Sequence, residues 1–197
     1  LYEDYNFDGI KDFAIMDGFN SCYGGPSFKI FLASGKEFIY NDAFTDLAQN
    51  YCGMFVVDNK NRLISTMEKS GCCLHYYSDF IVENNNPKLI RTRTDDCLKA
   101  PICTTTIEEW KGEKMTKTVT STIDLDSEII SDYFKFHVDK ENKDIILCNF
   151  YDDRLCYVIL DAKQNVEFYY PFEELRQTSD FIFYRKNGKL TFKNKDA

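Results

Sequence analysis

The stretch Cys73–Thr94, CLHYYSDFIVENNNPKLIRTRT, contains two runs of mixed apolar and polar residues separated by a polar turn. Alternation with a period of two is typical of a β-strand with one buried face. Asn84–Pro87 consists of residues that favour turns, and its proline stops ladder pairing. The sequence therefore predicts a β-hairpin that turns at Asn84–Pro87.

The same pattern recurs along most of the chain, with turn-forming clusters between the runs. Each pair of runs predicts a further hairpin. The pairs are Phe28–Ala33 with Glu37–Asn41, Met54–Asp58 with Arg62–Met67, Tyr133–Val138 with Asp144–Phe150, Leu155–Asp161 with Val166–Tyr170, and Phe181–Arg185 with Lys189–Phe192.

Two segments have helical features instead. Residues 41–53, NDAFTDLAQNYCG, carry Phe44, Leu47 and Ala48 at helical spacing behind an Asn/Asp cap, which predicts a short helix. Residues 171–177, PFEELRQ, offer a proline at a first helical position followed by acidic residues, which favours a second one.

Residues 99–118, KAPICTTTIEEWKGEKMTKT, have no clean period. We interpret them as a long connection that runs into a polar, Thr-rich strand ending near Leu125.

Together these segments predict an all-β fold. A chain of 197 residues with 44% hydrophobic and 16% aromatic residues can bury a sizeable core, so we expect a single domain over residues 1–197. We predict an antiparallel meander of hairpins with one or two short helices, arranged as a propeller-like ring of small sheets or as a two-sheet β-sandwich. Periodicity does not separate those two arrangements.

The chain is acidic. Lys and Arg number 24 and Asp and Glu number 32, which gives a formal net charge of −8. Binding to a phosphate backbone needs a basic surface, so we expect no nucleic-acid partner. A basic protein or a cation is a better match.

The eight cysteines are even in number and lack zinc-finger spacing, which indicates disulfides and an oxidising compartment. We expect local pairs between Cys97 and Cys103 and between Cys148 and Cys156. Adjacent Cys72 and Cys73 should reach different partners, and Cys22 and Cys52 are the candidates. Reduced, buried thiols in a cytosolic protein are the alternative.

The first residue is Leu1, and no apolar run is long enough for a transmembrane helix. A removed signal peptide or a lipoprotein segment would explain both features, and a trimmed cytosolic protein would begin the same way. We expect a periplasmic or secreted protein without a membrane span, with a lipid anchor through a missing N-terminal segment as an option.

The N-terminal stretch Asp4–Asp12, DYNFDGIKD, places oxygen-bearing groups at the spacing of a calcium loop. Asp4, Asn6, Asp8 and Asp12 occupy positions 1, 3, 5 and 9, Gly9 permits the turn at position 6, and Ile10 supplies its carbonyl at position 7. A strand-like run follows instead of an exiting helix, so we predict a structural Ca²⁺ loop that leads into a strand. An Asx-rich surface turn is the alternative.

Signatures of catalysis are sparse. The chain has two histidines and no GxSxG, HExxH, Walker or GxGxxG motif. Cys73 and His75 form a conceivable nucleophile pair, but oxidation of the cysteine would remove it. We therefore expect no enzymatic activity and interpret His137 as an ordinary strand residue.

The segment Asn20–Phe28, NSCYGGPSF, is a candidate for partner binding. Tyr23, next to two glycines and a proline, forms an aromatic on a rigid turn, which suits insertion into the cleft of a partner. A plain turn into the next strand is equally consistent with these residues.

The opening residues DYNFDGIKDFAIMDGFNSCYGGPSFKIFL, together with LAQNYCGMFVVDNKNRLISTMEKSGCCLHYYSDFIVENNNPKLI, resemble a family of bacterial periplasmic calcium-binding proteins. Members protect cells against peptidoglycan-cleaving effectors from contact-dependent secretion systems and are similar to periplasmic inhibitors of invertebrate-type lysozyme. The resemblance covers about residues 4–94.

The resemblance implies Ca²⁺ ligands at Asp4, Asn6, Asp8, Ile10 and Asp12. Lysozyme inhibitors of that group plug the enzyme cleft with a short Ser-Gly loop that ends in Tyr. The sequence SGCCLHYY contains Ser70 and Gly71 but has cysteines where the tyrosine would be expected. We take Tyr23, Ser70, Gly71 and His75 as partner-binding candidates.

Our leading hypothesis is an immunity protein that occludes the active site of a peptidoglycan-hydrolase effector, such as a type VI or type IV secretion toxin. Its acidity would speed association with a basic hydrolase. A calcium-stabilised adhesion or carbohydrate-binding module is the alternative, and a hydrolase that uses carboxylates or the Cys73/His75 pair is a third hypothesis.

Overall fold

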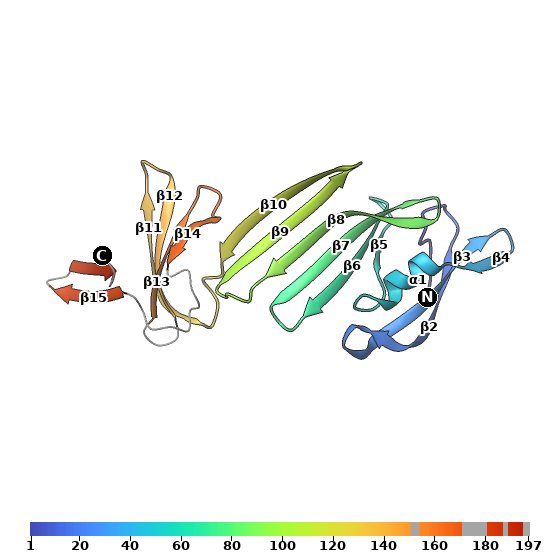
Figure 1. Cartoon of the computed structure of the whole chain (residues 1–197), viewed down its shortest axis with the longest axis horizontal. Helices are drawn as coiled ribbons and strands as arrows, with labels where there is room; N and C mark the ends of the chain where they lie inside the picture. Colours follow the sequence, from blue (N-terminus) through green and yellow to red (C-terminus); the bar gives the residue numbers. More distant parts are fainter. Residues whose placement is uncertain (151–153, 171–180, 187–188, 195–197) are drawn as a thin grey trace. The chain divides into compact units, whose positions relative to one another are not determined.

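A computed structural model describes residues 1–150, 154–170, 181–186 and 189–194, and it consists mainly of open antiparallel β-sheets (Figure 1). Within each sheet the strands lie in sequence order, so consecutive strands of a sheet pair with each other. The predicted all-β meander is confirmed. The second predicted helix, residues 171–177, lies outside the described residues.

The first sheet has the order β1-β2-β3-β4. Its strands are β1 (Tyr2–Glu3), β2 (Asp12–Ser21), β3 (Gly25–Ser34) and β4 (Glu37–Tyr40). A 3₁₀ turn, η1 (Cys22–Gly24), joins β2 to β3, and the helix α1 (Asp42–Gln49) follows β4.

The second sheet has the order β10-β9-β8-β7-β6-β5. It contains β5 (Val56–Asp58), β6 (Leu63–Ser70), β7 (Leu74–Glu83), β8 (Asn86–Asp96), β9 (Ile102–Lys111) and β10 (Lys114–Ile123). The hairpin predicted at Asn84–Pro87 is confirmed: β7 and β8 pair from Glu83 opposite Asn86 to Leu74 opposite Asp96.

The prediction of a long connection over residues 99–118 was wrong, because most of this segment forms β9 and the start of β10. Most β9 side chains are half-buried, so neither face shows a clear apolar stripe. A strand of that kind leaves no alternation in the sequence, while its Thr-rich composition suits extended backbone.

The remaining strands are β11 (Ile130–Val138), β12 (Lys143–Phe150), β13 (Arg154–Leu160) and β14 (Val166–Tyr170), which form a four-stranded sheet. A separate hairpin pairs β15 (Phe181–Lys186) with β16 (Lys189–Asn194). The predicted hairpins over these residues are confirmed.

The chain forms two compact units. The first comprises Leu1–Asp96 and Thr105–Val119, and the second comprises Cys97–Thr104 and the residues from Thr120 onward. Each has its own buried cluster. Since two compact units can belong to one domain, the single domain over residues 1–197 stays a prediction.

The core of the first unit joins the first sheet, the helix and the N-terminal loop. Ile30 and Leu32 of β3 are buried together with Phe44, Leu47 and Ala48 of α1, and the full cluster adds Tyr5, Phe7, Ala14, Phe55, Ile64 and Phe80. Asn41 caps α1, since its side-chain oxygen accepts the Phe44 amide (3.0 Å). The helical spacing seen in the sequence is therefore the buried face of a capped helix.

The core of the second unit lies on one face of the β11–β14 sheet. Ile146 and Cys148 of β12 are buried with Cys156, Val158 and Leu160 of β13. Cys148 and Cys156 are direct cross-strand partners.

Three of the four predicted cysteine pairings do not form. Cys97–Cys103 forms a disulfide as predicted. Cys22 pairs with Cys52 instead of reaching Cys72 or Cys73, and Cys148 and Cys156 are buried free thiols with their sulfur atoms 3.7 Å apart. The Cys148 sulfur and burial together raise the pKa of the Cys156 thiol, which keeps it protonated.

Tyr5 carries a buried hydroxyl group that has no hydrogen-bond partner within the described part of the chain. The Tyr5→Phe variant should gain about 1 kcal/mol in free energy of unfolding, because it removes a desolvated polar group and keeps the ring. Chemical denaturation at neutral pH measures this change. A loss of similar size would show that the hydroxyl group contributes to stability.

Burial raises the pKa of Tyr5 to about 12, and the charges of Glu3 and Asp12 add to the shift. Above about pH 10 the unfolded tyrosine loses a proton that the folded one keeps, so this group lowers stability as the pH rises toward 12. The stability gap between Tyr5→Phe and the wild type should therefore widen over that range.

Candidate metal loop and partner-binding site

The loop that precedes β2 alternates between core residues and oxygen-bearing residues. Tyr5 and Phe7 are 1% and 7% exposed and belong to the hydrophobic core. Asp4 is half-buried and Asp8 is exposed. The aromatic side chains anchor the loop, while these two carboxylates remain accessible to solvent.

Backbone amides curl this loop around its own carboxylates. Asp4 accepts the amides of Asp8 (3.1 Å) and Gly9 (2.8 Å), and Asp8 accepts the amide of Ile10 (2.7 Å). Gly9 has a φ of 88°, which favours glycine. The predicted sharp turn is therefore present at the predicted residue.

Asp12 connects the loop to the sheet. Its carboxylate is fully buried, with Oδ2 accepting the amides of Tyr5 (2.7 Å) and Asn6 (3.3 Å) and Oδ1 accepting the amide of Ala33 in β3 (2.8 Å). Burial raises the pKa of Asp12, and the three amide donors oppose that shift because they favour the ionised form. Asp12 thus has a structural role that needs no metal.

Two distant turns also hold the loop. Asn6 donates from Nδ2 to Oδ1 of Asn85 in the β7–β8 turn (3.0 Å). Arg62, in the β5–β6 turn, donates to the carbonyl of Phe7 (2.8 Å) and lies over the Phe7 ring at 5.7 Å. These contacts stabilise Phe7 at a φ of 61°, a left-handed conformation that is uncommon for this residue type.

The chemistry of the loop fits a hard cation. Asp4 and Asp8 offer carboxylate oxygens, Asn6 an amide oxygen and Ile10 a main-chain carbonyl, and Ca²⁺ takes ligands of these kinds. The described residues contain no group of three or more His, Cys, Asp or Glu side chains that could hold a metal ion. A calcium ion at this loop would therefore need the amide and carbonyl oxygens as well as the carboxylates.

At the other end of β2, the 3₁₀ turn η1 presents Tyr23. This side chain is 68% exposed, and its backbone adopts a left-handed conformation with a φ of 54° and a ψ of 27°. The preceding residue, Cys22, forms a disulfide with Cys52. The turn is therefore cross-linked to the segment that follows α1.

The tip of the β6–β7 hairpin contacts Tyr23. The Gly71 amide donates to the Tyr23 hydroxyl oxygen (2.7 Å), and the Lys69 ammonium lies 4.9 Å from the centre of the ring. Lys69, Ser70 and Gly71 are all exposed. The structure thus joins two of the predicted partner-binding residues, Tyr23 and Gly71, across 48 positions of sequence, with Ser70 beside them.

His75 lies next to this tip in the sheet. It pairs with Lys69 of β6 on one side and with Asp95 of β8 on the other. Directly paired residues share a face of the sheet, so His75 lies on the same face as Lys69. The sulfur of Cys73 contacts Cys72, and the described residues include no hydrogen bond from Cys73 to His75.

We call the exposed cluster of Tyr23, Lys69, Ser70, Gly71 and Cys72 the tip surface. Sequence reasoning missed the role of Lys69, because a cation over an aromatic ring leaves no local pattern when the ring belongs to another hairpin. The signal at Tyr23 was its position next to Gly24, Gly25 and Pro26, from which the sequence analysis predicted a rigid turn.

The first sheet has an aromatic row on the face opposite the helix. Tyr2, Phe13, Phe31 and Tyr40 pair directly with one another across β1, β2, β3 and β4. Tyr2, Phe13 and Tyr40 are 57%, 38% and 44% exposed. Their buried neighbours Ala14, Ile30 and Leu32 point to the core side, so the row forms a solvent-accessible aromatic face.

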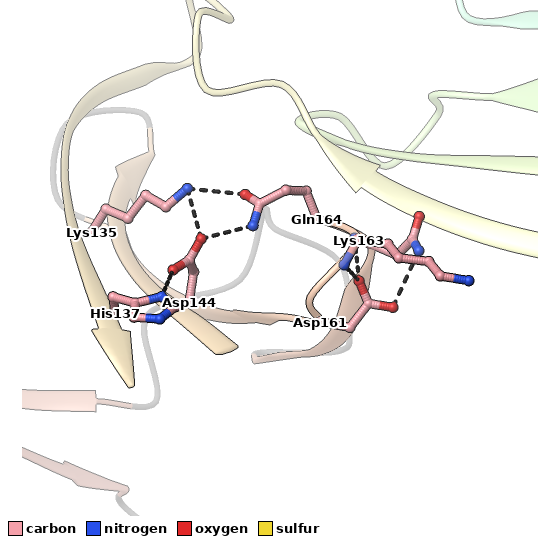
Figure 2. A network of polar contacts seen from close by, with 7 residues as sticks. Lys135, His137, Asp144, Asp161, Lys163 and Gln164 are labelled. Carbon is pink, nitrogen blue, oxygen red and sulfur yellow. Dashed lines mark hydrogen bonds and ion pairs between the residues drawn. The ribbon is translucent and has the colours of Figure 1, made fainter. Parts of the chain in front are cut away.

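The second unit contains a polar network around Asp144, which Figure 2 shows between Lys135, His137 and Gln164. Asp144 contacts Nζ of Lys135 (2.9 Å), Nδ1 of His137 (2.7 Å) and Nε2 of Gln164 (2.8 Å). Lys135 above all, then His137 and Gln164, lower the pKa of Asp144. Asp161 accepts the amides of Lys163 and Asn165 and so caps the β13–β14 turn.

These contacts supply hydrogen-bond partners to the Asp144 carboxylate, which is buried (7% exposed) at one end of the core. His137 is a strand residue, as the sequence predicted. A pocket of about 300 Å³ occurs near the same strands, with Val138, Ile145 and Phe168 among its lining residues, and the ion pair between Lys143 and Glu167 (2.8 Å) also lines it.

Comparison with known proteins gives one informative similarity. A solved structure described as a Xanthomonas type IV secretion system related protein matches with a TM-score of 0.54 and 26% sequence identity over 59% of this chain. The match covers 56% of that protein, so this chain spans little more than half of its length. No protein-family model matches the chain, and no curated protein matches it.

Proposed function

We propose that this protein is an immunity protein that binds a secreted peptidoglycan-hydrolase effector and occludes its active site. The hydrogen bond between the Tyr23 hydroxyl and the Gly71 amide carries the proposal, because it joins two exposed loops into one surface. An aromatic ring that is already held in place loses little conformational entropy when it enters a cleft. We assign the chain no catalytic residue.

Three restraints hold Tyr23 in place. The Cys22–Cys52 disulfide fixes the turn, the Gly71 amide holds the hydroxyl, and the Lys69 cation covers part of the ring. More than half of the residue still faces solvent. An anchor of this kind is preorganised, which is the usual requirement for a tight protein inhibitor.

The comparison supports a secretion-related role. The matching protein is described as related to a type IV secretion system, and an immunity protein against an effector of such a system would be consistent with that description.

The charge and the cysteines agree with the proposal. A net charge of −8 would increase the association rate with a basic hydrolase through electrostatic steering. The two disulfides indicate an oxidising, extracytoplasmic compartment, which we propose to be the periplasm or the outside of the cell. The described residues contain no helix long and apolar enough to cross a membrane.

We further propose that the Asp4–Asp12 loop binds a structural Ca²⁺ through Asp4, Asn6, Asp8 and the carbonyl of Ile10, with Asp12 positioning the loop or joining the ligand set. When bound, the ion would neutralise the carboxylates that the curled backbone gathers. Its contribution would be to the stability of the first unit, since Tyr5 and Phe7 of the same loop are core residues.

A carbohydrate-binding or adhesion module is the second candidate, and the aromatic row supports it. Tyr2, Phe13, Phe31 and Tyr40 form an accessible aromatic platform on a regular sheet. Aromatic faces pack against the apolar faces of sugar rings, so this surface would bind glycan without any enzyme present.

The first test is the lysis of purified peptidoglycan by the proposed hydrolase effector, with and without this protein and with calcium present. We expect complete inhibition at a one-to-one ratio. Tyr23→Ala should weaken binding about 30-fold, as expected for loss of a hot-spot residue. Tyr23→Phe should weaken it about five-fold, because it keeps the ring but loses the acceptor for Gly71.

Phe134→Ala is the matched control, because Phe134 is similarly exposed (64%) but belongs to the second unit. It should leave inhibition unchanged. Absence of any complex would remove the immunity proposal. Sedimentation of the protein with insoluble peptidoglycan, lost in Tyr40→Ala and kept in Tyr23→Ala, would favour the carbohydrate-binding candidate instead.

The calcium proposal is tested by thermal unfolding. Calcium at about 100 times its dissociation constant should add about 2.7 kcal/mol to the free energy of unfolding, and a chelator should remove this gain. Asp8→Ala should abolish the difference between the two conditions. Isothermal titration with CaCl₂ gives an independent measurement of binding.

Asp58→Ala is the control for the loss of turn hydrogen bonds. Asp58 accepts the amides of Lys60 and Asn61 much as Asp8 accepts that of Ile10, but it lies outside the loop. This variant should keep the full response to calcium. Identical melting curves of the wild type with calcium and with chelator would rule out the metal.

A further inference from the structure

The tip surface ends at Cys72, which forms with the next residue, Cys73, a pair of thiols to which the proposed function gives no role. Cys72 and Cys73 follow Gly71 directly, and their sulfur atoms lie 2.6 Å apart. Cys72 is exposed and Cys73 is half-buried, and both are free thiols.

The 2.6 Å between the two sulfur atoms is longer than a covalent disulfide bond and shorter than a van der Waals contact. A disulfide bond measures about 2.05 Å, whereas non-bonded carbon atoms rest about 3.5–4.0 Å apart. The two side chains therefore already point at each other, and little further rotation would bring their sulfur atoms to bonding distance.

We propose that Cys72 and Cys73 form a reversible vicinal disulfide by exchange with a small-molecule disulfide. The Cys72 thiolate attacks one sulfur of the external disulfide and releases one thiol. Cys73 then loses its proton to solvent, and its thiolate attacks the Cys72 sulfur and releases the second thiol. Two protein thiols are thereby oxidised, and one external disulfide is reduced to two thiols.

The Cys72–Cys73 bond is more easily reduced than the other disulfides of this chain. Adjacent Cα atoms are about 3.8 Å apart across a trans peptide, below the usual 4.4–6.8 Å between bridged cysteines. Strained and exposed disulfides are the labile class. Cys148 and Cys156 are buried and hence closed to exchange, although their sulfur atoms are also neighbours.

The modification acts directly beside the Tyr23 contact. Gly71, whose amide binds the Tyr23 hydroxyl, is the residue immediately before Cys72. Closing a ring over Cys72 and Cys73 restricts the backbone that presents this amide, so the tip surface exists in two covalent states. Formation of the Cys72–Cys73 disulfide requires no partner protein, and it does not depend on the inhibitor proposal.

The experiment incubates the full chain in buffers with graded ratios of reduced to oxidised glutathione, then blocks free thiols and digests with trypsin. The peptide of residues 70–88 contains Cys72 and Cys73 and no other cysteine. We expect a form that lacks two hydrogens and carries no blocking group, reversible by reduced glutathione at ratios at which Cys22–Cys52 stays intact. Cys72→Ser should abolish this form, and Cys148→Ser should leave it unchanged.

Two results would overturn the proposal. One is a peptide that stays fully blocked at every glutathione ratio. The other is a wild-type peptide that accumulates a mixed disulfide with glutathione, or a cross-link to a second chain, in place of the internal bond.

Discussion

The buried Asp12 carboxylate is the constraint on which the first unit depends. Its two oxygens collect amides from Tyr5 and Asn6 in the N-terminal loop and from Ala33 in β3. A buried carboxylate is costly unless such donors surround it, so the loop and the sheet must form together. The same arrangement brings the aromatic rings of Tyr5 and Phe7 into the core, which makes a polar loop part of the hydrophobic cluster.

Two strands that begin or end near Asp12 determine how the two candidate sites are arranged. β2 runs from Asp12 at the loop to Ser21, just before Tyr23, and β7 runs from Leu74 at the tip to Glu83, just before the turn that binds the loop. Each strand has ten residues and so spans roughly 30 Å. The loop and the tip surface are therefore at opposite ends of the same strands.

Sequence reasoning succeeded where a signal is local and failed where it depends on pairing. The hairpins, the capped helix and the glycine turn at Gly9 follow from periodicity, capping residues and backbone freedom. The segment of β9 was missed because its half-buried side chains do not alternate. Spacing favoured Cys148–Cys156 and not Cys22–Cys52, yet the latter forms, because two turns far apart in sequence meet in the fold.

The loop and the tip surface also differ in the interactions that hold them. Carboxylate oxygens and buried amides concentrate at the loop, so changes of charge there would act on the folding of the first unit. The tip surface has few core residues and depends on one hydrogen bond, one cation over a ring and nearby sulfur atoms. Because the core lies between them, we expect substitutions at the tip to cost little stability and substitutions in the loop to cost more. This division would suit the proposed immunity function, since the residues of the tip surface could then vary while the fold of the first unit is kept.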